Sequence, residues 1–281
     1  MLQHLTKSLL LSAVCLTACE SQPNTAPTPD PITHPSASLP DVAALLKKLA
    51  TQDGAKDASA EMRMQLEEAD GKRAQLEFQL QRKYSAQRTA TFLKVTAPRE
   101  DSDKALLAIE KPQAATEATS YLAGLKKLAK LGSSNTLNFH DAKVTVQELL
   151  GMELGQYSFN AGERVTVDGV ELIKVEGKAP AERNLAYPRV LVYFNAANQA
   201  PARFEVFDER NELQKTTRVE EVKQIQGHQT ITKLAVEEHL TKRKVRLETR
   251  SIKYDQNLAD KIFTEANLKS VITSVSQKLA Q

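Results

Sequence analysis

Apolar and polar residues alternate along much of the chain with a period of two, a pattern typical of strands that bury one face. The clearest segment covers residues 62–81, where two alternating runs flank the dipeptide Asp70-Gly71. An Asp-Gly turn between two such runs predicts an antiparallel hairpin. The apolar positions of this hairpin are Met62, Met64, Leu66, Leu76, Phe78 and Leu80.

Strand-like runs continue through most of the remaining sequence. They cover residues 89–95, 105–110, 157–167, 170–177, 190–194, 202–207, 213–222, 230–239 and 244–254. With the first hairpin, this makes about eleven strands, joined mostly by turns rich in Asn, Asp and Gly. Strands and helices do not alternate regularly, which disfavours a parallel doubly wound sheet.

Helical patterns are few. One follows Asp41, a capping residue, over residues 42–49, and others cover residues 125–131, 144–152 and 258–279. The sequence therefore predicts a mainly β protein with a few helices. Its architecture would be a single curved antiparallel sheet of about eleven strands, with helices over the concave face.

The first residues predict a targeting signal. Lys7 precedes an apolar run over residues 9–16, which is shorter than the roughly 20 residues of a membrane span. The run ends in Leu16-Thr17-Ala18-Cys19, which resembles the bacterial lipobox. That resemblance implies cleavage of residues 1–18 and acylation of Cys19. The alternative is an ordinary signal peptide in which Cys19 is incidental.

Residues 19–40 predict a tether. They contain six of the eleven prolines among small polar residues, so the segment has little to bury and should stay extended and disordered. At roughly 3.1 Å per residue it could hold residues 41–281 up to about 60 Å from a bilayer. We expect a lipid-anchored protein of the bacterial cell envelope that faces the periplasm. The choice between inner and outer membrane stays open.

Composition excludes several function classes. Lys and Arg number 38 against 35 Asp and Glu, a balance that does not favour nucleic-acid binding. Trp is absent, and both cysteines lie in the first twenty residues. The histidines show no metal-ligand spacing, and no nucleophile motif or Gly-rich phosphate loop occurs. The sequence thus predicts no catalytic site, no metal and no cofactor.

Two basic clusters have alternative interpretations. Lys126, Lys127 and Lys130 would form either a solvated helix face or a basic patch for lipid headgroups or an acidic partner. The second cluster covers residues 242–246. There the simplest interpretation is protection of an exposed strand against aggregation.

An ordered series of short motifs resembles the LolA/LolB-like superfamily, in the branch of outer membrane lipoprotein-sorting proteins. The series covers residues 41–270, and its segments are 92–98, 104–110, 138–150, 167–169, 200–208 and 263–268. The chain departs from that branch at residues 120–125, where the usual Trp and Pro are missing. The resemblance implies a half-open β-barrel with a helical lid over a cavity for acyl chains. It also places Phe263 and Leu268 on a closing segment against the sheet.

Two functions follow. The first is an envelope lipoprotein that binds acyl chains or the lipid anchor of another lipoprotein, in lipid or lipoprotein sorting to the outer membrane. The alternative is a non-enzymatic sensor or scaffold of the same fold that contacts a membrane protein. The apolar positions of the first hairpin are either ordinary core or the wall of the lipid pocket.

Overall fold

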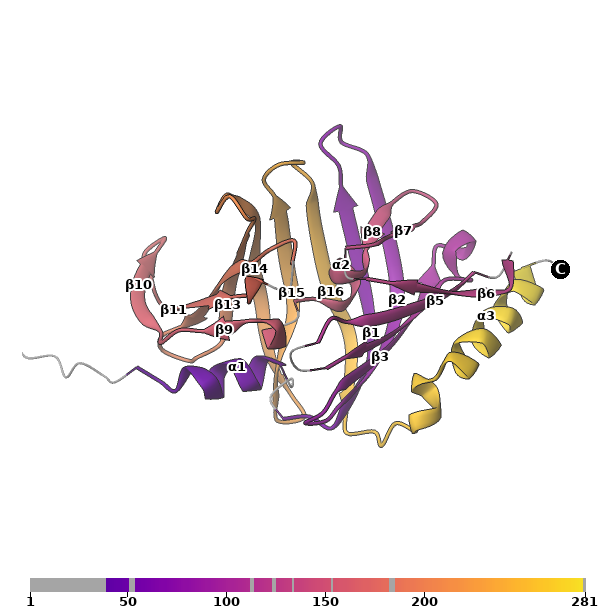
Figure 1. Cartoon of the computed structure of the whole chain (residues 1–281), viewed down its shortest axis with the longest axis horizontal. Helices are drawn as coiled ribbons and strands as arrows, with labels where there is room; N and C mark the ends of the chain where they lie inside the picture. The colour runs from indigo at the N-terminus through magenta and orange to yellow at the C-terminus, as the bar shows by residue number, and fades with distance from the viewer. Residues whose placement is uncertain are drawn as a thin grey trace, which may run out of the picture. The chain divides into compact units, whose positions relative to one another are not determined.

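The computed structural model describes residues 39–50, 54–111, 114–122, 125–132, 134–152, 154–181 and 185–279 (Figure 1). The predicted signal peptide, Cys19 and almost all of the predicted tether lie outside these residues. The described part falls into one unit, which begins at Leu39.

A curved antiparallel sheet dominates the fold. Within the described residues it has fourteen strands. They are β1 (Asp57–Glu67), β2 (Arg73–Tyr84), β3 (Thr89–Ala97), β4 (Ala105–Glu110), β5 (Glu117–Leu122), β6 (Lys127–Leu131), β9 (Ser158–Phe159), β10 (Glu163–Val167), β11 (Val170–Lys178), β12 (Arg189–Asn195), β13 (Pro201–Phe207), β14 (Leu213–Ile225), β15 (His228–Glu238) and β16 (Lys244–Tyr254). The order runs from β10 through β16 to β1 and on to β6, so that the first and last long strands are neighbours. The sheet is open, because its two edge strands, β10 and β6, do not pair with each other.

The remaining elements are short. They are the helices α1 (Val42–Ala50), α2 (Val146–Leu150) and α3 (Glu265–Leu279), the 3-10 turns η1 (Arg99–Asp101), η3 (Leu154–Gln156) and η5 (Asp260–Phe263), and the small hairpin of β7 (Thr136–Asn138) and β8 (Lys143–Thr145). The mainly β fold and its single curved antiparallel sheet confirm the prediction. The predicted number of strands, about eleven, is lower than the fourteen of the sheet.

One predicted helix is wrong. Residues 125–131 form a turn and β6, which pairs with β5. The leucines at 125, 128 and 131 mimic a helical period, but a positive φ of 50° at Lys126 turns the chain back as a hairpin. Leu128 and Leu131 then lie in different apolar clusters on opposite faces of the sheet. Residues 144–152 are also only partly helical, because they begin in β8.

Direct cross-strand partners share a face of a sheet, so the register defines one continuous inner face. Its successive partners from β1 back to β11 are Leu66, Val245, Val236, Thr217, Phe204, Val192 and Val175. Two apolar clusters occupy this face. One lies on β1–β4 beneath α2, and the other lies on β11–β13 beneath α1.

The C-terminal helix α3 covers the opposite, outer face. Phe263 and Leu268 pack with Ala90, Phe92 and Leu107, whose neighbours in β3 and β4 point to the inner face. Helices therefore cover the inner face, as predicted, but the longest of the three does not. Figure 1 shows α3 along the end of the sheet formed by β5 and β6.

The basic cluster of residues 242–246 is not at a sheet edge. Its strand, β16, lies between β15 and β1 in the middle of the sheet. The interpretation of these residues as protection of an exposed strand is therefore wrong. Arg243 instead contributes to the ionic cluster described below.

Candidate functional site

The six predicted pocket residues lie together on β1 and β2, on the inner face. Met62 lies opposite Phe78, and Met64 lies opposite Leu76. Met62 is partly buried and the other five are buried. The side chains that cover them come from the β7–β8 hairpin and α2, and include Phe139, Val144, Val146, Leu149 and Leu150. This half of the inner face is closed.

The covering helix α2 is fixed by its own sequence. Thr145 Oγ1 accepts from the backbone N–H of Glu148 at 3.2 Å, and Glu148 Oε2 accepts from the backbone N–H of Thr145 at 2.7 Å. This capping box satisfies N–H groups that the start of a helix leaves unpaired. At the other end, Arg82 donates to the carbonyl of Leu150 at 2.9 Å.

An ionic cluster ties α2 to the sheet. Glu148 Oε1 lies 3.2 Å from Nη1 of Arg243 and 3.8 Å from Nζ of Lys215. Lys215 also donates to Glu238 at 2.6 Å. Burial opposes the charge of Lys215, but the bond to Glu238 and the nearby carboxylate of Glu148 together raise its pKa. Breaking one of these partly buried ion pairs would leave a poorly solvated charge without its partner, so they help to hold α2 on the sheet.

The pKa values of Glu238 in the ionic cluster and of Tyr193, a buried residue of β12, predict how stability depends on pH. Burial opposes ionisation of Glu238, but its bonds to Lys215 and Thr241 lower its pKa below the ordinary carboxyl value. The stability that ionised Glu238 contributes is therefore present above the ordinary carboxyl pKa, and it is lost as pH falls through the lower pKa of the folded state. Burial raises the pKa of Tyr193 to about 12, so its contribution is present below the ordinary phenol pKa and is lost as pH rises through the folded value. We expect the free energy of unfolding in urea to be flat between about pH 5 and 9 and to fall below about pH 4 and above about pH 10. A maximum outside that range would contradict these shifts.

The second half of the inner face is covered by α1. Leu45 is buried, and Val42, Leu46 and Leu49 pack with it against a floor of Ile173, Val175, Val192, Phe194 and Phe204. A small gap of about 20 Å³ remains beside Leu45 and Leu49, next to Phe194 and Ile231. A helix of nine residues has little stability of its own, so α1 depends on these contacts.

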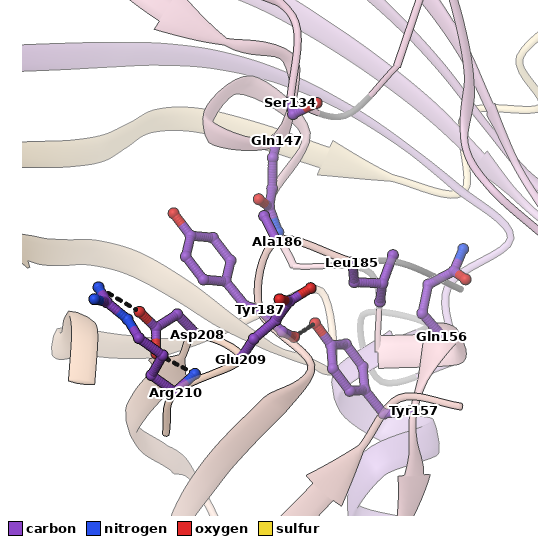
Figure 2. A pocket seen from close by; sticks show the side chains of 10 residues that line it. All are labelled: Ser134, Gln147, Gln156, Tyr157, Leu185, Ala186, Tyr187, Asp208, Glu209 and Arg210. Atoms are coloured by element: carbon purple, nitrogen blue, oxygen red, sulfur yellow. Dashed lines mark hydrogen bonds and ion pairs between the residues drawn. The ribbon is translucent and has the colours of Figure 1, made fainter. Parts of the chain in front are cut away.

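A cavity of about 500 Å³ opens beside α2 and η3 (Figure 2). Its lining residues are Ser134, Gln147, Gln156, Tyr157, Leu185, Ala186, Tyr187, Asp208, Glu209 and Arg210. The hydroxyl of Tyr157 donates to the carbonyl of Tyr187 at 2.9 Å and joins two walls of the cavity. The ring of Tyr157 lies 6.2 Å from that of Phe159, which packs in the cluster beneath α1. The ring pair of Tyr157 and Phe159 therefore links the cavity wall to the cluster under α1.

The cavity has an acidic lower wall. Asp208 accepts from the backbone N–H groups of Glu212 and Arg210, both at 2.9 Å, and the first of these contacts lowers its pKa most. Arg210 Nη2 lies 3.6 Å from Asp208 and 3.1 Å from Glu212, so its charge is shared between two carboxylates. Figure 2 shows this turn below Tyr187.

The other predicted site residues lie elsewhere. Lys126 is exposed in the turn before β6 and Lys127 is exposed at the first position of β6, whereas Lys130 donates to Glu265 and to Thr119. Phe263 and Leu268 lie on the outer face, away from the predicted pocket residues. Among the described residues there is no group of acidic, His or Cys side chains that could hold a metal ion. In that same part of the chain, no helix has the length and hydrophobicity of a membrane span.

Comparison with known proteins identifies the family. A family model described as an uncharacterized protein matches residues 87–270. The chain belongs to this family. A comparison with curated proteins gave no match.

Solved structures show that this member of the family has the LolA fold. A domain from Vibrio parahaemolyticus described as an outer membrane lipoprotein-sorting protein is 21% identical, with a TM-score of 0.70 over 80% of this chain and 97% of that one. A DUF1329 family protein from Desulfovibrio piger is 17% identical, with a TM-score of 0.71 over 80% and 96%. A LolA superfamily protein from Nitrosomonas europaea is 20% identical, with a TM-score of 0.66 over 80% and 98%. The fold that the resemblance in the sequence implies is confirmed.

Sequence reasoning missed the cavity. Tyr157 and Tyr187 are thirty residues apart, and each lies in a segment whose pattern carries no motif. The capping pattern of Thr145 and Glu148 was visible in the sequence, but the partners Lys215 and Arg243 lie on distant strands.

Proposed function

We propose that this protein is a lipid-anchored envelope protein that holds acyl chains, or the acylated end of a lipoprotein, on the inner face of its sheet. It would act without covalent chemistry, in the sorting of lipids or lipoproteins to the outer membrane. The LolA fold and the description of the Vibrio relative support this class of function.

One observation carries the proposal. The apolar floor formed by Ile173, Val192 and Phe194 is covered by a single short helix. A cavity of about 500 Å³ is linked to the same cluster through the ring pair of Tyr157 and Phe159. An acyl chain that replaced α1 would bury the same surface. Each methylene that it buries would contribute about 0.8 kcal/mol to binding. The acyl site that the LolA/LolB-like resemblance implies would thus be occupied by the chain's own α1 when no ligand is bound.

The predicted pocket residues of β1 and β2 belong to the same inner face. We propose that they extend the acyl site, because the register makes the two clusters one surface. A ligand would reach Leu76 and Phe78 only when α2 moves away, and the ionic cluster of Glu148 opposes that movement. The surface under α1 is therefore the first to be occupied.

Binding to this surface can be measured with one reporter. The chain has no Trp, so Ile231→Trp, at the gap beside α1, gives a single emission signal. Titration with palmitate should change that emission saturably, whereas butyrate should not. Adding Leu45→Ala should tighten palmitate binding about tenfold or more, because α1 competes less well for the floor.

The matched control is Ala44→Ser, on the exposed side of α1, which should leave the affinity within about twofold. Absence of a saturable palmitate signal would contradict acyl binding. Weaker binding in Leu45→Ala would contradict competition by α1.

The anchor predicts a change in location. We propose that residues 1–18 are cleaved and that Cys19 is acylated, with residues 20–40 as the tether. Cys19→Ser should move the protein from the membrane fraction to the soluble periplasmic fraction. The measurement is fractionation with an antibody to the body of the protein, and retention of Cys19→Ser on membranes would argue against the lipobox.

A further inference from the structure

The cavity lies where the polar end of an amphiphile would emerge. Gln147 belongs to α2, whose neighbours Val146 and Leu149 cover the β1–β4 half of the inner face. Tyr157 packs near Phe159, which belongs to the half beneath α1. A chain lying on either half could therefore place its head at this cavity. This inference rests on the proposed acyl site.

The lining offers groups that both donate and accept hydrogen bonds. Gln147 presents an amide that bonds to no side chain or backbone group in the part of the chain that the structure describes. Ser134 adds a hydroxyl. Gln156 is held in place by a bond from its amide to the carbonyl of Ala114. Amides and hydroxyls in this arrangement match a ligand whose own groups are hydroxyls.

Charge disfavours an anionic head relative to a neutral one. Two carboxylates, Asp208 and Glu209, line the cavity with one guanidinium, and Arg210 is already engaged by Asp208 and Glu212. The ammonium of Lys215, near Tyr187, is paired with Glu238 and Glu148. A phosphate placed here would therefore meet net negative charge at short range, which costs free energy in a partly desolvated site.

A cationic head is favoured less than a neutral one. The carboxylate of Asp208 already accepts from two backbone N–H groups and from Nε2 of Gln214 at 3.0 Å. Among the lining residues that the structure describes, only Glu209 is left to neutralise a cation, and it is exposed. Tyr187 already has the ammonium of Lys215 5.8 Å from its ring centroid. A second cation at that ring would repel the first.

We propose that this cavity binds an uncharged, hydroxyl-rich headgroup, of the chemical class of a hexose, on an amphiphile whose acyl chain lies on the inner face. A volume of about 500 Å³ lies within the usual range of small-molecule sites. The apolar edges of Tyr187 and Leu185 can pack against the CH groups of a sugar ring, while the amides bond its hydroxyls.

The test compares three heads on one chain length. Octyl glucoside, octyl phosphate and octyltrimethylammonium are titrated below their micelle concentrations into the full mature chain carrying Cys19→Ser, by calorimetry. We expect octyl glucoside to bind about tenfold tighter than either of the others. Gln147→Leu, which keeps size and helix propensity, should reduce that preference to about twofold or less. The matched control is Gln79→Leu, on the exposed outer face, which should leave the preference intact.

The outcomes separate this proposal from the acyl site. Equal affinity for the three heads, tightest binding of octyltrimethylammonium, or no effect of Gln147→Leu would overturn the headgroup assignment and leave palmitate binding intact. Palmitate binding with no measurable octyl glucoside binding would overturn it too. Absence of binding by all three amphiphiles and by palmitate would overturn the proposed function itself.

Discussion

Leu76→Asp should yield no folded protein. Leu76 is 2% exposed and lies opposite Met64 within the largest apolar cluster, under α2. An unpaired carboxylate there would have to lose its hydration or take up a proton at a high pKa. Either cost is comparable with the total stability of a domain, about 5–15 kcal/mol. We therefore expect the variant to lose its cooperative unfolding transition by circular dichroism.

The control for this charge lies on the same strand. Gln79 is exposed on the outer face, opposite Lys94 of β3, so Gln79→Asp should change the free energy of unfolding by less than about 1 kcal/mol. A Leu76→Asp protein that unfolds at the wild-type urea midpoint would show that this part of the inner face is open to water in solution.

Phe263→Ala should produce the second large loss. The ring is 7% exposed and packs with Phe92 and Leu107 on the outer face of the sheet. Truncation of a buried Phe leaves a cavity that rigid strands cannot fill, so we expect a loss of about 3–5 kcal/mol in urea unfolding.

Lys261→Ala provides the comparison, because Lys261 lies in the same turn and is exposed. It should cost less than about 0.5 kcal/mol. If Phe263→Ala also cost less than about 1 kcal/mol, the segment that carries α3 would be only loosely attached to the sheet.

The sequence predicted the fold well where local pattern and tertiary environment agree. Residues 62–81 alternate cleanly because β1 and β2 bury one face and expose the other, and they form the predicted hairpin. The pattern failed at β6, where α3 covers the outer face and the β7–β8 hairpin packs on the inner side. A short strand with apolar neighbours on both faces has no period of two to detect.

The candidate site was harder to predict. A run of apolar residues has the same pattern whether a helix or a ligand covers it, so the hydrophobic positions of β1 and β2 could not be divided between core and pocket. The helix that covers Phe194 could be predicted from residues 42–49, but its place on β11–β13 depends on contacts far apart in sequence. The cavity needed Tyr157, Tyr187 and Asp208 to come together from three separate segments.

The two coverings of the inner face differ in how they are held. Capping bonds and partly buried ion pairs attach α2, and these depend on Glu148, Lys215 and Arg243. The contacts of α1 with the apolar residues beneath it are themselves apolar, and an acyl chain could make equivalent contacts with those residues. This difference is why we place the first binding event under α1.

The most direct test of acyl binding is to map where the ligand lies. A palmitate analogue with a diazirine in its chain is equilibrated with the full mature chain carrying Cys19→Ser, irradiated, and the labelled peptides are sequenced by mass spectrometry. An acyl chain on the inner face predicts labels on Ile173, Val192 and Phe194, and their loss when unlabelled palmitate is added in excess. Labels confined to exposed residues such as Leu125 and Leu240, or labelling that excess palmitate does not suppress, would contradict it.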